Sequence, residues 1–233
     1  MKRLAIIPAR GGSKRIRDKN IRLFAGKPII SYPIKAALSS GLFDRVIVST
    51  DSRRIAATAS EFGAEVPFFR PSELASDFTP TAPVIRHALK YFEQEEEFQD
   101  YFCCIYATAV FVRQEDLIRG QEILREKNAT MAFSVSSYPG CIFRALRIDE
   151  SGRLTMFWPE HEKTRSNDLP AAYQDAGQFY WGDSRRFLQQ VSMYGKDAVP
   201  VYIPRYLVHD IDTPEDWEVA EKFFFALREK TER

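Results

Sequence analysis

The sequence predicts an α/β fold with a doubly wound, mostly parallel sheet, and two observations carry that prediction. First, segments typical of buried strands alternate with segments typical of helices from residue 3 to residue 136. Second, the strand-like segments are short, continuous apolar runs, as in strands that are covered on both faces. Because strands joined through helices lie parallel in one sheet, this alternation indicates repeated strand–helix–strand units.

The individual elements follow from the local pattern of the chain. Apolar positions at helical spacing indicate helices, and Gly41 and Gly63 are placed to end the first two of them. Asp51 is expected to cap the second helix. In order, the predicted elements are a strand at 3–8, a helix at 31–40, a strand at 45–49, a helix after residue 51, a short strand at 65–69, a helix at 84–94, a strand at 101–106, a helix at 114–127 and a strand at 130–136.

The alternation breaks after Ser136. Residues 138–175 contain prolines, two glycines and alternating strand-like runs, which indicates a β-rich excursion from the main sheet. Pro214 fits the first position of a final amphipathic helix. We therefore interpret residues 1–233 as a single domain with an excursion at 138–175. The elements predicted after the excursion are a strand at 177–181, a helix at 184–191, a strand at 199–203 and the helix at 214–230.

The composition excludes several classes of protein. Lys and Arg number 33 against 32 Asp and Glu, so the chain is nearly neutral. No apolar run approaches the ~18 residues of a transmembrane helix, and the apolar run after the N-terminal Met-Lys-Arg is too short for a secretory signal. Cys103, Cys104 and Cys141 suggest neither a disulfide framework nor a zinc site. These features favour the cytoplasm, with no membrane as a partner.

Positive charge is concentrated just after the first strand. Asp18 is the only acid between residues 10 and 27. Gly11 and Gly12 let backbone N–H groups approach an anion, and Arg and Lys neutralise phosphate charge, so the segment is typical of a phosphate-binding loop. It matches neither the Walker A pattern nor the dinucleotide fingerprint, and a turn with a solvated basic face is the alternative. The basic residues are Arg10, Lys14, Arg15, Arg17, Lys19, Arg22 and Lys27.

An acidic pair precedes the last predicted helix. Asp210 and Asp212 are alternate residues of an extended segment, so their side chains can face the same centre. Two carboxylates with free oxygens suit Mg²⁺, which usually bridges protein carboxylates and substrate phosphates. The alternative is that Asp212 only caps the helix while Asp210 is exposed. For the preceding His209 we favour packing or a surface position over metal ligation.

Three ordered motifs carry a resemblance to a known family. Residues 7–14, 19–21 and 26–30 closely resemble the opening motif of the sugar-activating cytidylyltransferases, which include the CMP-sialic acid synthetases. The resemblance implies a Rossmann-like nucleotidyltransferase fold and a loop that holds the triphosphate of CTP. It assigns phosphate contacts to Arg10, Gly11, Gly12, Ser13, Lys14 and Lys19, and a nucleotide contact to Asn20.

Two further segments extend the resemblance. Residues 69–75 are similar to a segment that lies by the cytosine in that family, which makes Arg70 the candidate base contact. Residues 209–213 are similar to the family's I-D-I-D-T segment, whose acids bind the catalytic metal. The resemblance thus implies Mg²⁺ on Asp210 and Asp212, with Arg10, Lys14 and Asp212 as the catalytic residues.

The acceptor site is predicted from segments 105–111 and 164–181. Both resemble the pseudaminic acid cytidylyltransferases more than the sialic acid enzymes, although Val110 replaces the usual proline. A sugar carboxylate suits the planar fork of Arg165, and acylamino groups suit side chains that both donate and accept. Phe179 and Trp181 are interpreted as core residues. The substrate-binding candidates are Tyr106, Thr108, Arg165, Tyr173 and Gln178.

The resemblance implies that the anomeric hydroxyl of a nonulosonic acid attacks the α-phosphorus of CTP and releases pyrophosphate. Pseudaminic acid is the expected acceptor, and the CMP-sugar would serve surface-glycan or flagellin glycosylation. N-acetylneuraminic, legionaminic or ketodeoxyoctulosonic acid is the alternative acceptor. A non-catalytic nucleic-acid-binding domain is the alternative of another class, and the short basic segment and near-neutral charge argue against it. Relatives pair through the excursion, so a homodimer is expected.

Overall fold

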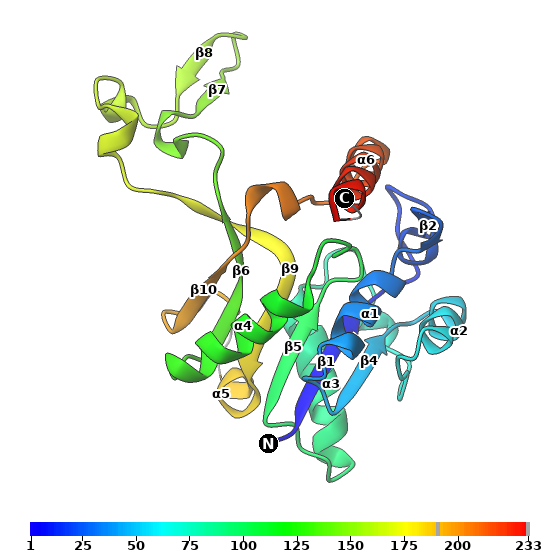
Figure 1. Ribbon diagram of the computed structural model, residues 1–233. Helices are drawn as coiled ribbons and strands as arrows, with labels where there is room; N and C mark the ends of the chain where they lie inside the picture. The colour runs from blue at the N-terminus through cyan, green and yellow to red at the C-terminus, as the bar shows by residue number, and fades with distance from the viewer. Residues whose placement is uncertain (190–191, 232–233) are drawn as a thin grey trace.

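The computed structural model describes residues 1–189 and 192–231, and its centre is a twisted, mostly parallel sheet (Figure 1). Within those residues the sheet has six strands in the order β10-β6-β9-β5-β1-β4. All of them run parallel except β9, which is antiparallel to both of its neighbours. This Rossmann-like arrangement confirms the predicted fold class. The strands are β1 (Arg3–Pro8), β4 (Arg45–Ser49), β5 (Tyr101–Ile105), β6 (Met131–Ser137), β9 (Tyr173–Asp183) and β10 (Ala198–Tyr202).

Helices cover both faces of the sheet. Alternate residues of β1 face opposite sides, so Ala5 and Ile7 belong to one buried cluster, and Leu4 and Ile6 belong to the other. The first cluster also takes apolar side chains from α1, α4 and α6, and the second from α3 and α5. The helices are α1 (Ser31–Ser39), α2 (Arg53–Glu61), α3 (Thr81–Gln94), α4 (Gln114–Glu126), α5 (Ser184–Gln189) and α6 (Pro214–Thr231). No helix of the described residues is long and apolar enough to cross a membrane.

The register of the parallel strands brings their carboxyl ends together. Ile6 of β1 pairs with Ile47 of β4 on one side and with Cys104 of β5 on the other. The loops that follow Pro8, Ser49 and Ile105 therefore open on the same edge of the sheet. That edge is where the basic loop predicted from the sequence lies.

Three predicted elements differ in the structure. Residues 65–69 do not form a strand, because Pro67 interrupts the pairing and leaves only isolated bridges from Glu65 and Phe69 to β4 and its exit. Helix α3 begins at Thr81 rather than at residue 84, since Pro83 is tolerated in a first turn. Strand β9 begins at Tyr173 because its first residues pair with the end of β6. The end of the helix predicted at 184–191 lies outside the described residues.

The cap of α2 also differs from the prediction. The Ser52 hydroxyl, and not the Asp51 carboxylate, accepts the hydrogen bond from the backbone N–H of Ile55. Asp51 accepts instead from the backbone N–H of Gly11 at 2.8 Å. The acid therefore fixes the basic loop after β1 and does not cap the helix.

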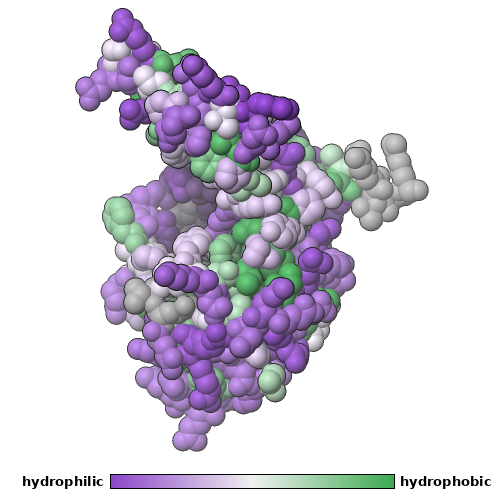
Figure 2. All heavy atoms as spheres, turned by 90° about the vertical axis from the view of Figure 1, so that its left-hand side faces the viewer, coloured by the Kyte–Doolittle hydropathy of each residue, from purple (hydrophilic) through white to green (hydrophobic). Residues whose placement is uncertain are grey.

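The excursion forms an arm that projects from the ends of β6 and β9 (Figure 1). It contains the short hairpin β7 (Leu146–Ile148) and β8 (Leu154–Met156), together with single 3₁₀ turns. Leu146, Ile148 and Leu154 are more than half exposed on this hairpin. Figure 2 shows the arm at the top of the molecule, with apolar surface between hydrophilic side chains.

We expect Gly182→Ala to lower the free energy of unfolding by about 1–3 kcal/mol, the usual cost of overpacking a core. Gly182 lies on β9 between Phe102 of β5 and Met131 of β6. An added Cβ would lie 2.4 Å from the Phe102 ring and 2.9 Å from the Met131 sulfur. Urea denaturation measures the change. Gly140→Ala is the matched control because its Cβ would meet no atom within 4 Å, and equal midpoints for the two variants would contradict the prediction.

Candidate active site

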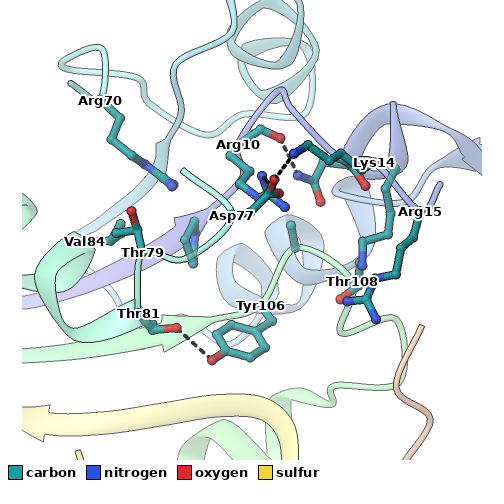
Figure 3. A pocket seen from close by; sticks show the side chains of 15 residues that line it. Arg10, Lys14, Arg15, Arg70, Asp77, Thr79, Thr81, Val84, Tyr106 and Thr108 are labelled. Carbon is teal, nitrogen blue, oxygen red and sulfur yellow. Dashed lines mark hydrogen bonds and ion pairs between the residues drawn. The ribbon is translucent and has the colours of Figure 1, made fainter. Parts of the chain in front are cut away.

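A cavity of about 470 Å³ opens at the carboxyl edge of the sheet, between the ends of β1 and β5 (Figure 3). The loop after β1 forms one wall, the segment before α3 forms another, and the exit of β5 closes the floor. Its lining is rich in cationic and hydroxyl side chains, which suits a polyanionic ligand. The lining residues are Pro8, Arg10, Ser13, Lys14, Arg15, Lys19, Asn20, Arg70, Asp77, Thr79, Thr81, Val84, Tyr106, Ala107 and Thr108.

The basic loop is held in place by its own backbone contacts. Gly11 is anchored to Asp51, and a Cβ at Gly11 would come 3.0 Å from the Ser52 Cβ, so the close approach favours glycine there. The Asn20 Nδ2 donates to the Arg10 carbonyl at 3.0 Å. Asn20 is nearly buried, so its amide fixes the loop from beneath while still reaching the cavity.

Two acids pair with the cations of this loop. Asp77 lies between Arg10 and Lys14, with N–O distances of 2.5 and 2.6 Å. Lys14 and Arg10, both hydrogen-bonded to Asp77, lower the pKa of its carboxyl. Asp212 pairs with Arg15 at 2.9 Å and with Lys19 at 3.2 Å. Our sequence prediction did not include Asp77 or Arg15 among the site residues.

Arg70 projects into the cavity from a nearly buried position (Figure 3). Its guanidinium donates from Nε to the Ser49 hydroxyl at 3.1 Å and from Nη2 to the Ser49 carbonyl. Burial lowers the pKa of Arg70, and the nearby Asp51 opposes that shift. The exit of β4 thus fixes this cation, which leaves its remaining N–H groups in a constant orientation.

The acidic pair flanks a buried anchor. Ile211 is 1% exposed, and Asp210 and Asp212 lie on either side of it in the chain. Partial desolvation raises the pKa of Asp210, and the charge of Asp212 raises it further, although the residue as a whole is exposed. Two carboxylates that interact in this way would be stabilised by a cation between them. Two carboxylates are a donor set that fits Mg²⁺ when phosphate oxygens and water complete the coordination. Among the described residues, no group of three or more acidic, His or Cys side chains is placed to hold a metal ion.

A different acid caps α6. The backbone N–H of Thr213 donates to Asp216 Oδ2 at 2.7 Å, and the backbone N–H of Asp216 donates back to the Thr213 hydroxyl at 3.2 Å. This reciprocal pair is a capping box. Asp212 is therefore available for the site, and the interpretation of it as a mere helix cap is wrong. The His209 ring packs against Phe111 and Phe223, as expected from the packing interpretation.

The five predicted acceptor residues do not all meet at the cavity. Tyr106 and Thr108 line it, and the Tyr106 hydroxyl is 2.9 Å from the Thr81 hydroxyl. Gln178 is 3% exposed and does not line it. Its Nε2 donates to the Leu207 carbonyl at 2.6 Å, and its Oε1 has no hydrogen-bond partner among the described residues. Gln178 therefore ties β9 to the segment that leads to the acidic pair.

The other two acceptor candidates lie on or beside the arm. The Arg165 side chain is 80% exposed, with Asp168 4.0 Å away. Tyr173 is 48% exposed and packs against the Tyr202 ring. Neither lines the cavity of its own chain. Phe179 and Trp181 are fully buried, which confirms their interpretation as core residues.

These features define a class of protein. A mostly parallel sheet carries at its carboxyl edge a cavity rich in cations, and Asp212 of the acidic pair is bound to two of those cations. Such a site suits an enzyme that handles nucleoside phosphates. A family model described as cytidylyltransferase matches residues 4–232, and the chain belongs to that family of CTP-dependent nucleotidyltransferases.

Individual relatives agree with that assignment. The chain is 40% identical to the pseudaminic acid cytidylyltransferase of Campylobacter jejuni subsp. jejuni serotype O:2, over 95% of each chain. It is 34% identical to the CMP-N,N'-diacetyllegionaminic acid synthase of Legionella pneumophila, over 95% of this chain and 96% of that one. The fold is similar to that of a CMP:2-keto-3-deoxy-manno-octonic acid synthetase complexed with CTP, with a TM-score of 0.74, 16% identity, and coverage of 97% and 99% of the two chains.

Proposed function

We propose that this protein transfers CMP from CTP to the anomeric hydroxyl of a nonulosonic acid and releases pyrophosphate, with pseudaminic acid as the acceptor. The observation that carries the proposal is the cavity lined by Arg10, Lys14, Arg15 and Lys19, the last two of which bind Asp212 of the acidic pair. Similarity to the Campylobacter jejuni enzyme over nearly the whole of both chains supports the choice of acceptor. The CMP-sugar would serve surface-glycan or flagellin glycosylation.

The loop after β1 would hold the triphosphate. Arg10, Lys14 and Lys19 would supply positive charge that balances the departing pyrophosphate, and the Ser13 hydroxyl would complete the cradle. Gly11 and Gly12 do not line the cavity, and the Gly11 N–H is bound to Asp51, so these glycines would shape the loop rather than contact the phosphates. Asn20 and Arg70 reach the cavity from nearly buried positions, so they are suited to orient the nucleoside. Most of the rate enhancement would then come from positioning and from preorganised charge.

Asp210 and Asp212 would hold Mg²⁺ beside the phosphates. When bound, the metal supplies charge for the α-phosphate and lowers the pKa of the attacking hydroxyl. The protein residues prepare this arrangement, because Lys19 donates to the Ile211 carbonyl at 2.8 Å and holds the acidic segment against the phosphate loop. Gln178 supports the same segment through its bond to the Leu207 carbonyl.

Tyr106 and Thr108 would contact the acceptor on the cavity floor, because both lie beside the phosphate loop. Burial raises the pKa of Tyr106, so its hydroxyl stays protonated and can donate. Arg165 and Tyr173 would act together with a second copy of the chain in a homodimer. Apolar side chains exposed on the arm, at Leu146, Ile148 and Leu154, support pairing through the excursion.

We place this activity in the cytoplasm, without nucleic acid or membrane as a partner. The buried thiols of Cys103 and Cys104 are unpaired, which suits a reducing compartment. The chain is nearly neutral overall, with 33 Lys and Arg against 32 Asp and Glu, which argues against a nucleic-acid-binding domain.

Incubation with CTP, Mg²⁺ and a panel of nonulosonic acids, followed by mass spectrometry, tests the proposed function. We expect a CMP-linked product with pseudaminic acid. If only another sugar of the panel gives a CMP-linked product, that sugar is the acceptor and pseudaminic acid is not. Salt-sensitive binding to oligonucleotides without turnover of CTP would favour the nucleic-acid-binding alternative.

We expect Lys14→Ala to weaken the use of CTP by about 1.5–3 kcal/mol, the cost of losing a charge-assisted contact, and to affect the use of the sugar much less. Lys14 belongs to the phosphate loop, and its ammonium lies 2.6 Å from the Asp77 carboxylate, where an anion is already accommodated. Steady-state kinetics with each substrate varied in turn gives the measurement. A change confined to the KM for the sugar would contradict the assignment.

A further inference from the structure

The carboxylate of Asp77 lies between two cations of the phosphate-binding loop, where the phosphate oxygens of a ligand would bind. One oxygen lies 2.5 Å from Arg10 Nη1, and the other lies 2.6 Å from Lys14 Nζ (Figure 3). The same two cations line the cavity and are placed to bind the triphosphate. A carboxylate with one oxygen on each cation thus satisfies donors that phosphate oxygens would otherwise use.

The segment that carries Asp77 is a small, self-contained turn. The hydroxyls of Ser76 and Thr79 are 2.7 Å apart, and the Thr79 hydroxyl donates to the Glu73 carbonyl at 3.2 Å. Phe78, at the tip of the turn, is 93% exposed and adds almost no apolar contact with the body. The two ion pairs of Asp77 therefore fasten this turn to the phosphate loop.

Asp77 and Asp212 both neutralise loop cations, but they differ in what a ligand would do to them. A divalent cation arriving with the nucleotide would balance the charge of Asp212. Asp77 pairs instead with Arg10 and Lys14, the two cations that the phosphates would take. Two anions that compete for one pair of donors repel each other, so one of them has to leave.

We propose that Asp77 is a built-in counter-ion of the phosphate-binding loop, which the triphosphate displaces on binding, and that it sets the affinity of the cavity for polyphosphate. The identity of the ligand rests on the proposed function. The bound carboxylate keeps the cations ordered in the free enzyme and reduces the fraction of molecules that are open to a phosphate. The Asp77 carboxylate also favours ligands that carry several negative charges. It pairs again with Arg10 and Lys14 as pyrophosphate leaves, which assists the release of that product.

Calorimetric titration of the protein with inorganic pyrophosphate, and separately with CTP, tests this proposal in the presence of Mg²⁺. We expect Asp77→Asn to bind both ligands about tenfold more tightly than the wild type, because the competing state is removed. Binding of cytidine, which has no phosphate, should not change. Glu73→Gln is the matched control, since Glu73 lies exposed in the same segment and pairs with no loop cation among the described contacts.

Unchanged or weaker pyrophosphate binding by Asp77→Asn would overturn the proposal. An equal gain in Glu73→Gln would also overturn it, since the effect would then be one of net charge. Asp77→Ser serves as a second variant if the asparagine form does not fold. If the wild type does not bind CTP, the proposed function fails, and the pyrophosphate titrations still decide the role of Asp77.

Discussion

Replacing Asp212 with asparagine is expected to lower kcat by at least ~150-fold, a loss of about 3 kcal/mol, which is typical for one preorganised electrostatic group. The carboxylate pairs with Arg15 and Lys19, so it orders these cations, and in the proposed reaction it would also offer an oxygen to Mg²⁺. It is not needed for the cap of α6, which Thr213 and Asp216 make between them. The variant should therefore fold normally, and the loss should fall on turnover.

Initial rates at saturating CTP, sugar and Mg²⁺ measure this effect, together with thermal unfolding of each variant. Asp216→Asn is the control, because it removes the same charge four residues away. The asparagine oxygen can still accept from the backbone N–H groups of Asp212 and Thr213, so this variant loses only the negative charge near the start of α6. Its stability should fall by about 0.3–1 kcal/mol, and kcat should stay near the wild-type value. An Asp212→Asn protein with the wild-type rate would remove Asp212 from the site.

Pseudaminic acid is expected to exceed N-acetylneuraminic acid in kcat/KM by at least ~100-fold, or about 2.7 kcal/mol. Pseudaminic acid has two acylamino groups and a methyl terminus where neuraminic acid has a glycerol tail. A site that leaves polar groups of the wrong sugar unpaired discriminates strongly between the two. The identity of 40% to the pseudaminic acid enzyme of Campylobacter jejuni favours a site of that kind.

Competition of the two sugars at equal concentration, with limiting CTP, measures the ratio directly. Gln178→Glu is informative in the same assay. Gln178 is buried and donates a hydrogen bond to the Leu207 carbonyl. Its substitution should therefore lower kcat for both sugars alike and leave the ratio of their kcat/KM values unchanged. A ratio near one for the wild type would remove pseudaminic acid as the preferred acceptor and leave the family assignment intact.

The place of the basic loop at the cavity could be predicted from the sequence because its signal is local. Glycines and cations follow a buried strand within a few residues, and Arg10, Ser13, Lys14, Lys19 and Asn20 all reach the cavity. Asp77 could not be found in this way. It meets Arg10 and Lys14 only after the chain has passed through β4, and an acid in a polar turn is otherwise an ordinary surface residue.

Other misses arise from side chains that serve more than one purpose. An amide such as Gln178 can contact a sugar or satisfy a buried carbonyl, and the sequence does not distinguish these roles. Asp51 and Ser52 are both suitable N-cap residues. Asp51 accepts a hydrogen bond from the backbone N–H of Gly11, and Ser52 caps the helix. The direction of β9 depends on its pairing with β5 and β6, which no local pattern specifies.

The most direct test of the proposed reaction follows the phosphorus atoms of CTP. The protein is incubated with Mg²⁺, pseudaminic acid and CTP labelled at either the α- or the γ-phosphorus. The proposed reaction requires that the α-label appear in the CMP-sugar and the γ-label in pyrophosphate, in equal amounts and only when sugar is present. Transfer of the γ-label to the sugar, or release of pyrophosphate that does not depend on the sugar, would contradict it.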